Sequence, residues 1–177
     1  MASLAEKLLA ISDSLTSAGF KHAFGGAIAL AYCVEEPRGT RDIDVNIFVP
    51  AARAREATGA LPPQIQVTEQ AVAEILRDGQ TRVWWDDTPV DLFLNNLPVH
   101  DEVAAEVRWV PFSGQDIPVL SCESLVLFKA FFNRTKDWAD IEAIADTRPA
   151  IIESAASRVE ELVGPEDEFT VRLRTFF

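Results

Sequence analysis

Two aspartates stand out as residues whose type and spacing could do chemistry. Asp42 and Asp44 alternate with apolar residues in the run 40–49, a pattern typical of a strand with one buried face. Side chains two residues apart on a strand point to the same side, so both carboxylates would share one small space. A divalent cation, which prefers oxygen ligands, would remove their repulsion. The pair predicts a Mg²⁺ or Mn²⁺ site, although an isolated Asp-x-Asp is more often the solvent face of an edge strand.

A third carboxylate strengthens this interpretation. Asp91 lies in the apolar run 90–94, whose alternation leaves it on the face opposite the buried side chains. If this strand lies beside the strand of Asp42 and Asp44, all three carboxylates converge. That arrangement matches a site with two metal ions about 4 Å apart for in-line phosphoryl displacement. Asp91 is then the candidate for accepting the proton of an attacking hydroxyl.

Two further features could bind a triphosphate. The pair Gly25-Gly26 predicts a turn whose backbone N–H groups can approach phosphates where the next helix begins, although it could also be a simple tight turn. Lys129 is the charged residue of the otherwise apolar run 125–132, which is typical of a buried helix. Its ammonium group either extends to water or points into a cleft and pairs with phosphate oxygens.

The elements that must position these residues follow from hydropathy patterns and capping residues. The first part of the chain predicts helices over 3–18, 27–33, 51–59 and 68–76, and strands over 21–24, 40–49, 81–85, 90–94, 107–112 and 117–120. The rest predicts helices over 123–132 after Ser121, 138–145 after Thr135, 151–163 and 166–177. We therefore expect an α/β (α+β) core with a mixed β-sheet flanked by helices over 1–120. A C-terminal helical subdomain over 121–177 would pack on it.

Composition indicates an ordinary soluble globular protein. The chain has 177 residues, 48% hydrophobic and 25% charged, and no apolar run approaches the ~20 residues that span a membrane. Charged residues near the N-terminus interrupt any secretory signal, so we expect a cytoplasmic protein with no membrane association. A net charge of −12 disfavours a broad nucleic-acid-binding surface. Two basic groups could still steer a polyanion to one face: Arg38, Arg41, Arg53 and Arg55, and Lys129, Arg134 and Lys136.

The cysteines and histidines are not expected to do chemistry. Cys33 and Cys122 lack the spacing of a metal or redox motif, so we expect two small core residues without a disulfide. His22 and His100 lie outside the motifs and are expected to be structural or exposed.

Taken in order along residues 1–145, these motifs resemble the AbiEii/MenT toxin branch of the DNA polymerase β-type nucleotidyltransferase superfamily. The resemblance implies the nucleotidyltransferase fold, Mg²⁺ dependence and a toxin role in a toxin–antitoxin pair, in which relatives add nucleotides to the 3′ end of tRNA and stop translation. The residues that carry it are Gly25-Gly26, the run 38–44, Asp91, Lys129, the run Arg134-Thr135-Lys136-Asp137, and Asp140.

The resemblance also assigns roles to individual residues. Gly25 and Gly26 would hold the triphosphate, Asp42, Asp44 and Asp91 would bind metal, and Lys129 would contact phosphates. The nucleotide site would also include Thr40, Arg41, Lys136 and Asp137. Many superfamily members have Gly-Ser where this chain has Gly-Gly, so a hydroxyl contact to phosphate is lost, with Thr40 nearby.

Thr40 also has a possible regulatory role. Strand alternation would place it on the face of the aspartates, where a phosphate on its hydroxyl would oppose metal and substrate binding. It could equally be a β-forming threonine at the start of a strand.

The sequence thus predicts transfer of NMP from an NTP to an acceptor hydroxyl, with tRNA as the acceptor and a cognate antitoxin as a partner. Two alternatives remain open. Net acidity suits a cationic aminoglycoside better than tRNA, which favours an antibiotic-modifying nucleotidyltransferase. A catalytically idle nucleotide-binding protein would lack one of the carboxylates, and none is missing.

Overall fold

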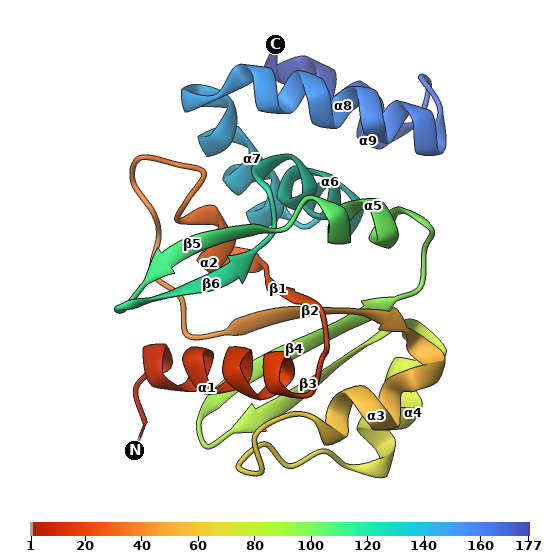
Figure 1. Ribbon diagram of the computed structural model, residues 1–177. Coiled ribbons are helices and arrows are strands. Elements are labelled where there is room, and N and C mark those ends of the chain that lie inside the picture. Colours follow the sequence, from red (N-terminus) through yellow and green to blue (C-terminus); the bar gives the residue numbers. More distant parts are fainter. Residues whose placement is uncertain (1) are drawn as a thin grey trace. The chain divides into compact units, whose positions relative to one another are not determined.

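A computed structural model describes residues 2–177, which form two compact units (Figure 1). One unit extends up to Ile28 and continues from Gly39 to Leu120. The other combines the segment Ala29–Arg38 with residues Ser121–Phe177. The second unit is therefore discontinuous in sequence, because ten residues between two parts of the first unit belong to it.

The first unit is built on a six-stranded mixed sheet, which confirms the predicted fold class. The strands lie in the order β3-β4-β2-β1-β6-β5. In the centre, β1 pairs antiparallel with β2 and parallel with β6, and β2 pairs parallel with β4. The two ends are the hairpins β3–β4 and β5–β6. The strand bounds are β1 His22–Phe24, β2 Ile43–Pro50, β3 Gln80–Trp85, β4 Thr88–Asn95, β5 Arg108–Phe112 and β6 Gln115–Val119.

The strand β2 begins later than the alternation predicts. Ile43, Val45 and Ile47 are fully buried, as expected for the core face. The predicted strand over 40–49 is observed only from Ile43, where pairing with β4 starts at Val90. Residues before Ile43 pair with neither β1, which ends at Phe24, nor β4. The prediction that Thr40 shares a strand face with the aspartates is therefore wrong.

Helices of the first unit mostly match the sequence pattern. A capping box of Ser3 and Glu6 begins α1, and Gly79 with a φ of +74° ends α4. The helix α5 was not predicted, because its seven residues are too few to show a clear helical period and Pro98 supplies no side-chain cap. The helix bounds are α1 Leu4–Ser17, α2 Gly26–Leu30, whose last two residues belong to the second unit, η1 Ala51–Arg53, α3 Ala54–Gly59, α4 Glu69–Asp78 and α5 Val99–Ala105.

Helices of the second unit follow one another with short connections. Ser121 is the N-cap of α6, as predicted, and its hydroxyl accepts a hydrogen bond from the backbone of Ser124. Thr135 was predicted to cap the next helix, but that helix begins at Thr135 itself and Arg134 occupies the cap position. The bounds are α6 Cys122–Phe132, α7 Thr135–Thr147, α8 Pro149–Val163, α9 Glu168–Leu173 and η2 Arg174–Phe176.

A disulfide within the second unit joins Cys33 and Cys122, which corrects the expectation of two separate core thiols. Their Cα atoms lie 5.6 Å apart, although 89 residues separate them in sequence. Spacing rules recognise nearby cysteines, and they carry no information about two segments that meet only through the tertiary fold.

Both histidines have structural environments. His22 and His100 are buried, and the backbone carbonyls of Phe20 and Leu97 each lie within hydrogen-bonding distance of one imidazole nitrogen. Burial lowers the pKa of both imidazoles. Within residues 2–177, no helix has the length and apolar character needed to cross a membrane.

Lys7 connects the first helix to the β3–β4 hairpin. Its side chain is 1% exposed, and Nζ donates hydrogen bonds to the carbonyl oxygen of Trp85 at 2.9 Å and to Oγ1 of Thr88 at 3.0 Å. Carboxylates of Asp86 and Asp87 lie 3.4 and 3.6 Å from the same nitrogen. The ammonium group therefore fixes the turn that sets the register of the hairpin.

Replacement of this lysine tests that role. Lys7→Met keeps most of the buried volume but removes the hydrogen bonds that Nζ donates to the Trp85 carbonyl and the Thr88 hydroxyl. We expect a loss of about 1–3 kcal/mol in the free energy of unfolding, measured by urea denaturation. Lys21→Met, at an exposed lysine, should change it by less than about 0.5 kcal/mol. Equal effects of the two substitutions would contradict the structural role of Lys7.

Candidate active site

The predicted neighbourhood of the two aspartate strands is confirmed. Strands β2 and β4 pair in parallel, and the register places Asp44 directly opposite Asp91. Asp42 lies just before the first residue of β2. Asp44 and Asp91 are only partly buried, whereas Ile43 and Val45 on either side of Asp44 are fully buried. One face of the sheet thus carries carboxylates while its other face carries the core.

The glycine turn lies directly against one of these carboxylates. The backbone N–H of Gly25 donates to the carbonyl oxygen of Asp44 at 2.9 Å. Gly26 has a φ of +50°, and a Cβ there would lie 1.8 Å from Oδ2 of Asp44. No other residue fits at Gly26 without moving this carboxylate. Because the backbone N–H of Gly25 is bonded to Asp44, Gly25 shapes the site by supporting Asp44.

Sequence reasoning missed Arg82, which is the cationic partner of the carboxylates. Its Nε and Nη2 donate to the two carboxylate oxygens of Asp91, each at 2.7 Å, and Nη2 lies 3.6 Å from Oδ2 of Asp42. Hydrogen bonding to Asp91 raises the pKa of Arg82 despite the opposing effect of burial, and the charges of Asp42 and Asp44 raise it further.

The signal for Arg82 was present in the sequence. The β3–β4 hairpin pairs Trp85 with Thr88, so counting three residues back and three forward places Arg82 opposite Asp91. Directly opposed charges on neighbouring strands attract each other. Arg82 alternates with the buried Thr81 and Val83, which leaves it on the same face as Asp91.

Carboxylates are ligands that a divalent cation prefers, but in this structure these three are not arranged as a metal site. Among residues 2–177, no three His, Cys, Asp or Glu side chains form a group that could hold a metal ion. Both oxygens of Asp91 accept hydrogen bonds from Arg82. The oxygen ligands are those that Mg²⁺ and Mn²⁺ prefer, and a single positive group already reaches Asp42 and Asp91.

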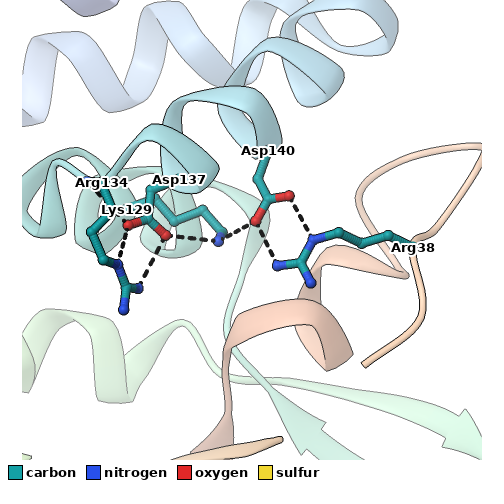
Figure 2. A network of polar contacts seen from close by, with 5 residues as sticks. All are labelled: Arg38, Lys129, Arg134, Asp137 and Asp140. Carbon is teal, nitrogen blue, oxygen red and sulfur yellow. Dashed lines mark hydrogen bonds and ion pairs between the residues drawn. The ribbon is translucent and has the colours of Figure 1, made fainter. Parts of the chain in front are cut away.

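Lys129 lies in the second unit, at the centre of an ionic network (Figure 2). The lysine is 4% exposed, and its Nζ lies 2.6 Å from Oδ2 of Asp140 and 3.4 Å from Oδ1 of Asp137. Arg134 donates to Asp137 at 2.6 Å through Nε. Arg38 donates to both oxygens of Asp140, each at 2.9 Å. The network ties the segment Ala29–Arg38 to α7.

These contacts revise the expectation for Lys129. Its ammonium group does not extend to water, and two buried carboxylates compensate its charge. The two alternatives predicted from the sequence, extension to water and pairing with phosphate, both took the lysine as uncompensated, and the ion pairs overturn that premise.

The remaining predicted nucleotide-site residues are more exposed. Arg41 and Lys136 are exposed, and Lys136 belongs to the second unit. Thr40 is partly buried, and its hydroxyl accepts a hydrogen bond from the backbone N–H of Asp42 at 3.1 Å. This threonine stabilises the backbone immediately before β2.

Several solved structures have a similar fold. An antigenic nucleotidyltransferase-like protein from Paracoccidioides brasiliensis aligns with a TM-score of 0.52 at 16% identity, over 94% of this chain and 90% of that one. Lincomycin-bound LnuA, a lincosamide antibiotic adenylyltransferase, aligns with a TM-score of 0.53 at 15% identity, over 78% and 94%. The fold is nucleotidyltransferase-like. ANT(2″)-Ia in complex with adenylyl-2″-tobramycin shares this nucleotidyltransferase-like fold, with a TM-score of 0.50 at 18% identity over 95% and 93%.

No protein-family model and no curated protein sequence matches the chain. The likeness at these identities establishes the fold, and membership of the AbiEii/MenT branch stays a prediction.

Substitution of Gly26 tests the contact with Asp44. In Gly26→Ala, the new methyl group and the positive φ should displace the Asp44 carboxylate and lower the free energy of unfolding by about 1–3 kcal/mol. Gly39→Ala, where a Cβ meets nothing within 4 Å, is the matched control and should be close to neutral. Urea denaturation measures both. A neutral Gly26→Ala would show that Asp44 is not held against this turn.

The ionic network predicts a dependence of stability on pH. Burial alone would raise the pKa of Asp140, but hydrogen bonds from Arg38 and Lys129 and their charges outweigh burial and lower it below its ordinary 3.8. The unfolded chain therefore takes up a proton at Asp140 before the folded chain does. The stabilisation is complete well above pH 4 and is lost as the pH falls below that value.

Asp140→Asn should cost about 3–5 kcal/mol of unfolding free energy at pH 7, because Lys129 stays buried with one counter-ion fewer. The difference from the wild type should shrink between pH 5 and pH 3, measured by urea denaturation across that range. Asp146→Asn, at an exposed position of α7, should show neither effect. A difference that is independent of pH would contradict the ionic role of Asp140.

Proposed function

We propose that the protein is a metal-dependent nucleotidyltransferase that transfers NMP from an NTP to an acceptor hydroxyl and releases pyrophosphate. The observation that carries this proposal is the position of Asp44, which lies against Gly26 and opposite Asp91 in a nucleotidyltransferase-like fold. A turn without side chains beside paired carboxylates leaves room for a phosphate chain next to oxygen ligands.

The carboxylates Asp42, Asp44 and Asp91 would hold Mg²⁺ or Mn²⁺. When bound, the cation would neutralise the charge that develops during phosphoryl transfer. Gly25 and Gly26 keep Asp44 in place and exclude side chains from the phosphate path. The acceptor oxygen forms a bond to the α-phosphorus, the bond to the β-phosphate oxygen breaks, and Asp91 accepts the proton of the hydroxyl.

For the acceptor, we propose the 3′ end of tRNA, with a toxin role that a cognate antitoxin controls. The order of motifs in the sequence supports this choice, and the exposed Arg41 and Lys136 are available to phosphates. Arg38 and Lys129 are less available, since both are ion-paired with Asp140. These substrates would place the reaction in the cytoplasm, where reducing conditions would favour opening of the Cys33–Cys122 disulfide.

A small cationic antibiotic is the second candidate acceptor. It is supported by the net charge of −12, which attracts cations. Among proteins of similar fold, LnuA is a lincosamide antibiotic adenylyltransferase with bound lincomycin, and ANT(2″)-Ia is in complex with adenylyl-2″-tobramycin.

The test is incubation of the purified protein with Mg²⁺, each labelled NTP, and either total tRNA or an aminoglycoside. We expect labelled tRNA, and at least about a 100-fold loss in Asp42→Ala, Asp44→Ala or Asp91→Ala. Asp78→Ala, at an aspartate paired with the adjacent Arg77, should retain activity.

Each other outcome has a distinct meaning. Label on the antibiotic alone would select the second acceptor. NTP binding without transfer to any acceptor would indicate an idle nucleotide-binding protein. Full activity in Asp44→Ala would refute the assignment of the site.

A further inference from the structure

Arg82 occupies the place where a cation is expected among the carboxylates. Its guanidinium group forms two parallel hydrogen bonds of 2.7 Å to Asp91 and reaches within 3.6 Å of Asp42. The Asp91 side chain is only 19% exposed, whereas the Arg82 side chain is 48% exposed. The carboxylate is thus fixed in the sheet, and its partner lies at the boundary with solvent.

The position of Arg82 allows it to leave. It extends from β3, which is the edge strand of the sheet, and its neighbours on that face, Gln80 and Trp84, are also exposed. Because water can solvate the released guanidinium group at this exposure, breaking the pair costs less than it would in the core. A divalent cation at the same oxygens would carry twice the charge and would repel Arg82.

We propose that Arg82 is a built-in counter-ion that holds Asp91 in the absence of metal and must leave before a divalent cation binds. It therefore sets the metal affinity of the carboxylates. This inference depends on the proposed function, because it takes the carboxylates as the metal site. In this description, the guanidinium keeps Asp42 and Asp91 close together in the free protein, and its release is the cost of metal binding.

The test measures binding of Mn²⁺ alone, with no nucleotide or acceptor present, from the loss of the free-ion electron paramagnetic resonance signal. Arg82→Gln removes the competing charge and should bind Mn²⁺ about tenfold more tightly than the wild type. Arg77→Gln is the matched control, since Arg77 is also exposed and paired with an aspartate, and it should bind as the wild type does.

A second measurement uses stability. Without metal, the neighbouring carboxylates of Arg82→Gln lack their counter-ion, so its melting temperature should fall. Millimolar Mg²⁺ should then raise that temperature more than it raises that of the wild type. Arg82→Lys keeps the charge but loses the two parallel bonds, and should give an intermediate Mn²⁺ affinity; it also serves if Arg82→Gln does not fold without metal.

The outcomes separate this inference from the proposed function. Equal or weaker Mn²⁺ binding by both Arg82 variants, with binding that Asp44→Ala abolishes, would overturn the role of Arg82 and leave the metal site intact. No Mn²⁺ binding by the wild type or by either variant would overturn both.

Discussion

The close approach of Asp44 to the backbone of Gly26 is the constraint on which the candidate site depends. It requires a residue without a side chain at Gly26, and it requires β1 to end where the turn begins. Because β1 pairs with one edge of β2, the same contact fixes which residues of β2 face the carboxylate side. Pairing of β2 with β4 on its other edge then brings Asp91 opposite Asp44. One steric restriction and two strand pairings thus place the carboxylates.

The buried acids Asp137 and Asp140 and the partly buried Asp91 each have a basic partner. Arg82 pairs with Asp91, and Lys129 lies between Asp137 and Asp140. In both units the guanidinium groups approach from the exposed side, whereas the lysine of the second unit is buried. Burial of a carboxylate is costly without such a partner. Lys129 and Arg38, which the sequence associates with phosphate, therefore also stabilise the free protein through Asp140.

Local patterns were sufficient to predict most elements and the adjacency of the two aspartate strands. Alternation in β2 identified Ile43, Val45 and Ile47 as core residues because burial of one sheet face repeats every two residues. The pairings of Lys129 with Asp140 and of Cys33 with Cys122 could not be predicted, since they join segments brought together only by the tertiary fold. Arg82 is an intermediate case. The hairpin was predicted from its turn residues, and its register places Arg82 opposite Asp91.

The second unit is discontinuous in sequence, and this limits how the chain could be shortened or recombined. The polypeptide crosses between the units after Ile28, after Arg38 and after Leu120. A chain that ended at Leu120 would keep every carboxylate of the candidate site, yet it would carry Arg38 without Asp140 and Cys33 without Cys122. The helices could not be exchanged for another set by recombination at a single point. Exchange of the helices would therefore also have to replace the segment Ala29–Arg38, because Arg38 and Cys33 pair with residues of the C-terminal part.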